Sequence, residues 1–187
     1  MNKELKRLSL GSILAAVAVV FGLIIKYTPG LNLEMPQGGA VFGIYMLPIV
    51  LSGLILGSFY GGLTGLIYGV VSWMLDGYYI HWGSIFFDYL IPFSAMGIIG
   101  GLFVGGIKDW KKIVLAFLLA GVFRWVSHGF SGVLFFEEYA KGNVWFYSFI
   151  LYNAPYCASS TAISMILAIL IGPSLTPFLE EFRKKRA

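Results

Sequence analysis

The sequence predicts an all-α integral membrane protein with six transmembrane helices and both termini in the cytoplasm. Of its 187 residues, 58% are hydrophobic and only 12% are charged, whereas a soluble globular domain carries about 25% charged residues. The mean hydropathy is +0.83, and a single cysteine, Cys157, excludes a disulfide scaffold. Because each spanning helix takes about 20 residues, the chain has room for six spans and short connections. We therefore expect one membrane domain over 1–187, with no extramembrane catalytic domain.

Apolar runs separated by turn-forming residues define the first three spans. The first run, at about 8–26, contains a small-residue triplet at 16–18 that resembles a signal-peptide cleavage site. The run continues beyond this triplet, so we predict a retained helix. A stretch rich in Gly and Pro, 28–40, precedes a short second span at about 41–56, and a tight glycine-containing connection leads to the third, at about 59–75.

The last three spans are separated by more polar connections. The fourth, at about 82–107, begins after a polar Asp-Gly turn. A lysine-rich connection, 108–112, precedes the fifth span at about 113–136, and a polar loop, 137–144, precedes the sixth at about 145–171.

Lysine and arginine placement predicts the orientation of these spans. With the N-terminus in the cytoplasm, ten of the thirteen basic residues fall in inner segments: Lys3, Lys6, Arg7, Lys108, Lys111, Lys112, Arg183, Lys184, Lys185 and Arg186. Outer loops hold only Lys26 and Lys141. This asymmetry follows the positive-inside rule for six helices with both termini cytoplasmic. Topology therefore explains the net charge of +4, and we expect no nucleic-acid partner.

Four polar residues fall inside spans, where ionisable groups are costly and usually mark functional sites. They are Asp88 in the fourth span, Arg124 and His128 in the fifth, and Asn153 in the sixth. A rise of 1.5 Å per residue puts Asp88, His128 and Asn153 at nearly one level, about 9–12 Å below the outer boundary, with Arg124 about 18 Å deep. The simpler alternative is that Asp88 and Arg124 form only a structural ion pair between helices.

Aromatic residues gather at the same level. They include Tyr78, Tyr79, Tyr89, Phe136 and Tyr147, together with Trp82, Trp125, Trp145 and Tyr152. Part of this group belongs to the aromatic belt of the membrane interface, and we expect the rest to form the wall of a pocket open to the outside. A carboxylate, neutral donors and aromatic faces suit a small, flat, cationic ligand, held by hydrogen bonds and cation–π contacts.

Several catalytic signatures are missing from the sequence. It contains no Gly-x-x-x-x-Gly-Lys-Ser/Thr phosphate loop, so the chain should not hydrolyse ATP itself. It has no His-Glu-x-x-His motif, and two histidines with one cysteine disfavour a protein-only metal site. A Gly-x-Ser-x-Gly hydrolase elbow is also missing. We predict that the protein is not an enzyme and binds neither a metal nor a cofactor.

Five segments along the chain point to a family. They are 35–41 with Met46-Leu47-Pro48-Ile49, Asp76-Gly77-Tyr78-Tyr79-Ile80-His81, Phe87-Asp88-Tyr89-Leu90, His128-Gly129-Phe130-Ser131-Gly132, and 147–153. In this order they resemble the thiamin-specific S-component (ThiT or YuaJ) family of energy-coupling-factor (ECF) vitamin transporters. The resemblance implies an S-component fold in the bacterial cell membrane and high-affinity binding of thiamin from the outside. It also implies release inward through a transmembrane coupling subunit and two cytoplasmic ATPase subunits, which alone use ATP.

The resemblance implies roles for individual residues as well. Asp88 matches the family's acidic residue that hydrogen-bonds the aminopyrimidine, His128 the pocket histidine, and Asn153 the asparagine near the thiazolium. The matching aromatic positions are Tyr78 with Tyr79 as its alternative, Phe136, and Tyr147 at the start of the last helix, and we expect Tyr89, from the aromatic group, to line the same pocket. Arg124 falls where a basic residue can occur, and we expect it to lie below the ligand and to orient the Asp88 carboxylate.

Small residues in the first span form a candidate partner interface. Ser12 and Ala16 match the family's small-residue surface for the coupling subunit, and Ala15 follows Gly11 at the same four-residue spacing. Such spacing lets helices approach closely, either within this chain or against a partner.

Two alternative functions remain open from the sequence. One is an S-component for another vitamin or a thiamin precursor. The other is a self-sufficient proton-coupled carrier or channel in which Asp88, Arg124 and His128 relay protons.

Overall fold

The computed structural model describes residues 3–76 and 78–177, and these residues form helices and no strands. The α-helices are α1 (Lys3–Tyr27), α2 (Met46–Leu56), α3 (Ser58–Asp76), α4 (Trp82–Ile85), α5 (Ile91–Leu102), α6 (Trp110–Phe135), α7 (Val144–Phe146) and α8 (Ala154–Ile171). Two π-helical segments, η1 (Phe86–Leu90) and η4 (Tyr147–Asn153), join α4 to α5 and α7 to α8. Short 3₁₀ turns are η2 (Gly106–Lys108), η3 (Glu137–Tyr139) and η5 (Gly172–Leu175). Because α4, η1 and α5 form one continuous helix, and α7, η4 and α8 another, the described part of the chain has six helices. The predicted all-α fold of six helices is therefore confirmed.

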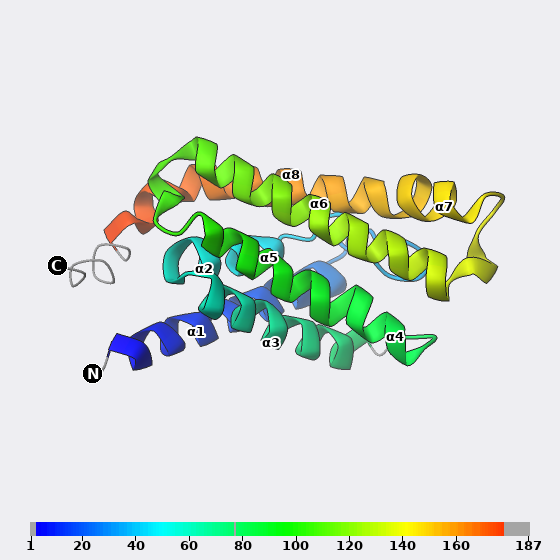
Figure 1. Cartoon of the computed structure of the whole chain (residues 1–187), viewed down its shortest axis with the longest axis horizontal. Coiled ribbons are helices and arrows are strands. Elements are labelled where there is room, and N and C mark those ends of the chain that lie inside the picture. The colour runs from blue at the N-terminus through cyan, green and yellow to red at the C-terminus, as the bar shows by residue number, and fades with distance from the viewer. Residues whose placement is uncertain (1–2, 77, 178–187) are drawn as a thin grey trace.

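Five of these helical segments are long and apolar enough to cross a membrane, so the chain is a multi-pass membrane protein. They are Glu4–Tyr27, Ser58–Leu75, Trp82–Leu102, Trp110–Phe135 and Val144–Leu175. Figure 1 shows the helices running along the long axis, with the start of α1 and the end of α8 at the same end of the bundle. Because both lie at one end, the chain must return along the bundle between α1 and α3, and it does so through residues 28–45 and the shorter helix α2 (Met46–Leu56).

Helix α2 departs from the predicted second span. It begins at Met46, whereas we expected the span to begin at residue 41. Pro48 explains this start, because proline has no N–H and is tolerated only in the first turn of a helix. Eleven residues rise only about 16 Å, too short for a bilayer core of about 30 Å. Every residue of α2 is buried, and the helix packs against α1, α3, α5 and α8.

The predicted fourth span is also too long at its end. It was expected to reach residue 107, but the helix stops at Leu102. Gly105 has a φ of 82°, a left-handed conformation that breaks the helix and that glycine adopts without strain. The chain then turns through η2 into α6, whose N-cap is the side chain of Asp109.

A seam of glycines joins α3 to α5. A Cβ placed at Gly65 would overlap the carbonyl oxygen of Phe93, and one at Gly97 would overlap that of Gly61. Only glycine permits this backbone-to-backbone contact, which resembles the small-residue packing common between membrane helices. Further along α3, Gly69 faces the carbonyl of Tyr89 in η1, so the glycine seam also sets the position of η1.

The small residues of α1 divide between two faces. Ala15 is only 2% exposed and lies in the interior, whereas Ser12 and Ala16 are exposed. Thr64 of α3 donates a hydrogen bond to the carbonyl of Gly11 at 3.2 Å, which places Gly11 on the inner face as well. Ala15 therefore does not belong to an exposed partner surface, because the helical period places it on the same inner face as Gly11.

Candidate functional site

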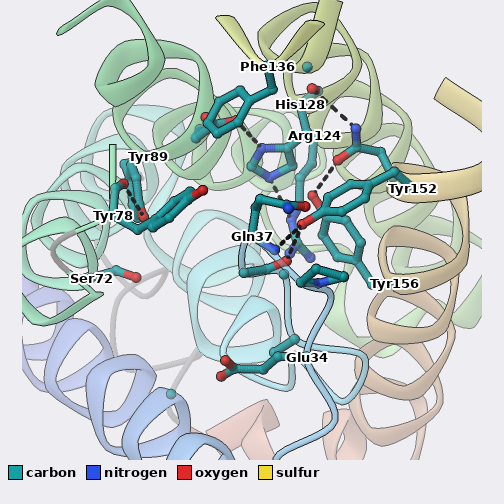
Figure 2. A pocket seen from close by; sticks show the side chains of 18 of the residues that line it. Glu34, Gln37, Ser72, Tyr78, Tyr89, Arg124, His128, Phe136, Tyr152 and Tyr156 are labelled. Atoms are coloured by element: carbon teal, nitrogen blue, oxygen red, sulfur yellow. Dashed lines mark hydrogen bonds and ion pairs between the residues drawn. The ribbon is translucent and has the colours of Figure 1, made fainter. Parts of the chain in front are cut away.

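A cavity of about 310 Å³ lies between the helices, within the range of small-molecule sites. Its wall combines α1, the 34–40 segment, α3, η1, α6, η4 and α8. Figure 2 shows His128, Arg124, Tyr152 and Tyr156 on one side of this space, with Glu34 and Ser72 across it. The cavity is thus built from segments far apart in the sequence.

Two of the predicted polar residues, Asp88 and Asn153, lie in the two π-helical segments. Each segment is followed by a proline at the second position of the next helix, Pro92 and Pro155. Proline removes a backbone donor, so carbonyl groups in the preceding turn lose their helical partner. Side chains of α6 supply other donors to these segments. Ser127 Oγ donates to the carbonyl of Phe87 at 2.6 Å, and Trp125 Nε1 donates to that of Phe149 at 2.7 Å.

The carboxylate of Asp88 is held by two side chains of α6. Ser131 Oγ donates to Asp88 Oδ2 at 2.6 Å, and His128 Nδ1 lies 3.1 Å from Asp88 Oδ1. The Asp88 side chain is 23% exposed while that of His128 is 8% exposed. A carboxylate has about four acceptor positions, so Asp88 retains acceptor capacity towards the cavity.

Arg124 is fully enclosed, with 1% of its surface exposed. Its guanidinium donates to His128 Nε2 at 3.2 Å, to Ser160 Oγ at 2.7 Å and to Tyr45 Oη at 2.6 Å. The guanidinium also lies 5.3 Å from the ring centres of Tyr45 and Tyr156, a cation–π distance. The protein thus supplies three hydrogen-bond acceptors and two aromatic faces to this buried cation.

Arg124 and Asp88 do not form the direct ion pair that was the simpler alternative from the sequence. His128 stands between them, with one ring nitrogen towards each. The structural ion pair considered from the sequence is therefore replaced by a chain of three side chains. Arg124 reaches the carboxylate only through the imidazole.

Asn153 ties η4 to α6. Its Nδ2 donates to the carbonyl of Ser148 at 2.8 Å and to that of His128 at 3.3 Å, while its Oδ1 accepts from Tyr156 Oη at 2.6 Å. His128 thus contacts both Asp88, through its ring, and Asn153, through its backbone carbonyl, so the three polar residues lie close together along the bundle. The amide of Asn153 lines the cavity with its hydrogen bonds largely used by the protein.

Five of the predicted aromatic residues line the cavity: Tyr78, Tyr89, Phe136, Tyr147 and Tyr152. The rings of Tyr78 and Phe136 stack at 6.1 Å, and Tyr89 Oη donates to the carbonyl of Tyr78 at 3.2 Å. Burial, followed by the nearby Tyr139 and Glu138, raises the pKa of Tyr78 above its ordinary value, so its hydroxyl keeps its proton. Tyr78 therefore presents a neutral ring and hydroxyl to the cavity.

Tyr79, the alternative to Tyr78, lies outside the cavity wall. It is 54% exposed and packs edge-on against Trp73 at 6.4 Å. Of the two neighbouring tyrosines, only Tyr78 belongs to the site.

The 34–41 segment, part of which lines the cavity, is hydrogen-bonded to side chains of η4 and α8. Tyr152 Oη accepts from the backbone N–H of Gln37 at 3.0 Å and donates to the carbonyl of Gly38 at 2.9 Å. Ser159 Oγ donates to the carbonyl of Val41 at 2.7 Å. Gly39 has a φ of 96°, and a Cβ there would meet the ring of Tyr156 at 3.0 Å, so glycine is needed at this point.

Removing the hydroxyl of Tyr152 should loosen this segment. A hydrogen bond contributes about 0.5–1.5 kcal/mol, so we expect Tyr152→Phe to speed amide exchange at Gln37 roughly twofold to tenfold. Hydrogen–deuterium exchange of the purified protein measures this rate. Tyr60→Phe, on α3 outside the cavity wall, is the matched control. Unchanged exchange at Gln37 in Tyr152→Phe would show that other contacts hold the segment.

Sequence reasoning missed several residues of the site, and three of these belong to its hydrogen-bond network. Ser131 follows Arg124 and His128 at helical spacing (124, 128, 131), and this periodicity could have placed it beside Asp88. Tyr156 follows Asn153 by three residues and could have been found in the same way. Tyr45 lies in the turns before α2, where no periodicity applies.

Among residues 3–76 and 78–177, no group of three His, Cys, Asp or Glu side chains is placed to hold a metal ion.

Known proteins resemble this chain in both sequence and fold. A family model described as thiamine transporter protein (Thia_YuaJ) matches residues 8–179. Thiamine transporter ThiT of Bacillus subtilis (strain 168) is 33% identical over 182 residues, covering 91% of this chain and 92% of that protein. ThiT from Listeria monocytogenes has the same fold, with a TM-score of 0.77 at 24% identity, over 95% of this chain and 98% of that one. This chain therefore belongs to the thiamine transporter protein family.

Proposed function

We propose that this chain binds thiamin in the cavity and serves as the substrate-binding subunit of an ECF transporter. The observation that carries the proposal is the partly exposed Asp88 carboxylate, which faces a cavity of about 310 Å³ walled by tyrosines and Phe136. Membership of the thiamine transporter family supports thiamin as the ligand.

The chemistry of thiamin matches that of the wall. Its aminopyrimidine presents N–H donors, and Asp88 offers the carboxylate that accepts them. Its thiazolium is a permanent cation, for which the faces of Tyr78, Tyr147 and Phe136 provide cation–π contacts. Arg124 lies at the cavity wall with only 1% of its surface exposed, and its guanidinium is flanked by the rings of Tyr45 and Tyr156, which limits its repulsion of the ligand.

The orientation and the partners belong to the same proposal. The positive-inside pattern puts both termini in the cytoplasm of a bacterial cell. The cavity lies towards the opposite end of the bundle and would therefore open to the outside. A transmembrane coupling subunit and two cytoplasmic ATPase subunits would then drive release, because this sequence has no phosphate loop. The exposed Ser12 and Ala16 of α1 offer a small-residue face to the coupling subunit.

Calorimetric titration of the purified protein tests the ligand. We expect saturable, one-to-one binding of thiamin, weaker binding of its isolated pyrimidine moiety, and none of riboflavin. Calorimetry is preferable to tryptophan fluorescence, because the cavity wall described by the structure contains none of the five tryptophans. Saturable binding of another vitamin without thiamin binding would instead identify an S-component of different specificity.

Uptake into vesicles tests the transport mechanism. We expect vesicles containing this chain alone, with an imposed proton gradient, to accumulate no thiamin, because the energising subunits are missing. Accumulation by the chain alone would contradict the ECF proposal and favour the proton-coupled carrier.

A further inference from the structure

The contact between Arg124 and His128 determines where the imidazole carries its proton. Nε of Arg124 lies 3.2 Å from Nε2 of His128, and the two residues are 1% and 7% exposed. A guanidinium has only donors and stays protonated in proteins, so Nε2 must accept. The proton of a neutral ring then lies on Nδ1, 3.1 Å from Asp88 Oδ1.

We propose that Arg124 is a positioning residue: it locks His128 as the Nδ1–H tautomer, so that the ring donates to Asp88 and holds its carboxylate towards the cavity. With both ring nitrogens engaged, His128 acts on a ligand through Asp88 rather than through a hydrogen bond of its own. The effect on thiamin affinity rests on the function proposed above, whereas the tautomer itself does not.

The surroundings leave Arg124 as the group that sets this tautomer. Around the ring of His128, Asp88 comes from η1, Phe93 from α5 with ring centres 6.5 Å apart, and Tyr156 from α8 with ring centres 6.0 Å apart. Tyr156 donates its hydroxyl proton to Asn153. Asp88 alone could accept a hydrogen bond from either ring nitrogen, because the ring can flip. The Arg124 donor at Nε2 therefore selects the Nδ1–H tautomer.

The guanidinium is itself held in place for this task. Its two terminal nitrogens are anchored by Ser160 on α8 and Tyr45 before α2, which leaves Nε directed at the imidazole. The planar fork of arginine makes these three bonds simultaneously, and the single ammonium of lysine cannot reproduce their geometry.

Nitrogen-15 NMR of histidine-labelled protein, without ligand and at pH 8, reads the tautomer directly. The chain has only two histidines, His81 and His128, and His81→Asn assigns the signals while preserving an N-cap. His81 is an internal reference of the opposite kind, since its Nδ1 accepts from the N–H of Gly83 at 3.0 Å. We expect a protonated Nδ1 and a bare Nε2 for His128, and the reverse for His81.

Substitutions at Arg124 complete the test. Arg124→Met should populate the Nε2–H tautomer of His128 and weaken thiamin binding tenfold or more, with Arg124→Lys intermediate. Arg7→Met removes an arginine from the opposite end of the bundle and should change neither. A protonated Nε2 on His128 in the wild type overturns the inference even if no Arg124 variant folds. So does an Arg124→Met protein with the Nδ1–H tautomer and wild-type affinity. Failure of the wild type to bind thiamin would overturn the proposed function but leave the tautomer assignment standing.

Discussion

Asp88→Asn is expected to weaken thiamin binding about tenfold to a hundredfold. Hydrogen bonds to a charged group contribute about 1.5–3 kcal/mol, and each 1.4 kcal/mol corresponds to a factor of ten in affinity. Both carboxylate oxygens already face donors, Ser131 Oγ and His128 Nδ1. An amide would turn its own NH₂ group towards one of these donors, so one of the two hydrogen bonds would be lost. Calorimetry at neutral pH measures the loss.

Two further variants serve as controls for Asp88→Asn, one at the same position and one elsewhere in the chain. Asp88→Glu retains the carboxylate, so we expect it to bind thiamin more tightly than Asp88→Asn does. Asp109→Asn makes the same chemical change at the N-cap of α6, outside the cavity wall, where asparagine also caps well. It should bind thiamin as the wild type does. If Asp88→Asn keeps wild-type affinity, the carboxylate has no part in binding.

Gly97→Ala is expected to cause the largest loss of stability among single-methyl substitutions. Its Cβ would overlap the carbonyl oxygen of Gly61, and a backbone atom cannot move aside as a flexible side chain can. Overpacking costs about 1–3 kcal/mol and sometimes more. Separation of α3 from α5 would also shift η1, and with it Asp88. We therefore expect a lower thermal unfolding temperature in detergent and weaker thiamin binding.

Gly11→Ala is the matched control for this substitution. It adds the same methyl group to a helical glycine, but the new Cβ would lie 3.4 Å from Thr64 Oγ1, an ordinary contact. Its unfolding temperature should equal or exceed that of the wild type, since alanine favours the helix. A Gly97→Ala protein as stable as Gly11→Ala would show that the α3–α5 seam tolerates separation.

Helix number and the level of the polar residues could be predicted because both depend on regular periodicity. Apolar length predicts spans, and a constant rise per residue brings Asp88, His128 and Asn153 together. The same periodicity, applied to α1, would have separated the buried Ala15 from the exposed Ser12 and Ala16. Three glycines of α3 recur every four residues (61, 65, 69), so the seam was also open to prediction.

Other parts of the site depend on contacts that no local pattern records. Tyr78 and Tyr79 are neighbours in a loop, where side-chain direction follows no period, so their roles could not be separated. The position of His128 between Arg124 and Asp88 depends on three side chains meeting across helices. Tyr45, which anchors Arg124, lies in irregular turns held by the packing around them.

A crystal or cryo-electron microscopy structure of the protein with thiamin tests the central claim most directly. We predict thiamin inside the cavity, with an N–H group of its aminopyrimidine at hydrogen-bond distance from the Asp88 carboxylate. His128 should remain between Arg124 and Asp88. Thiamin bound outside this cavity, or inside it with the Asp88 carboxylate turned away from the ligand, would contradict the account.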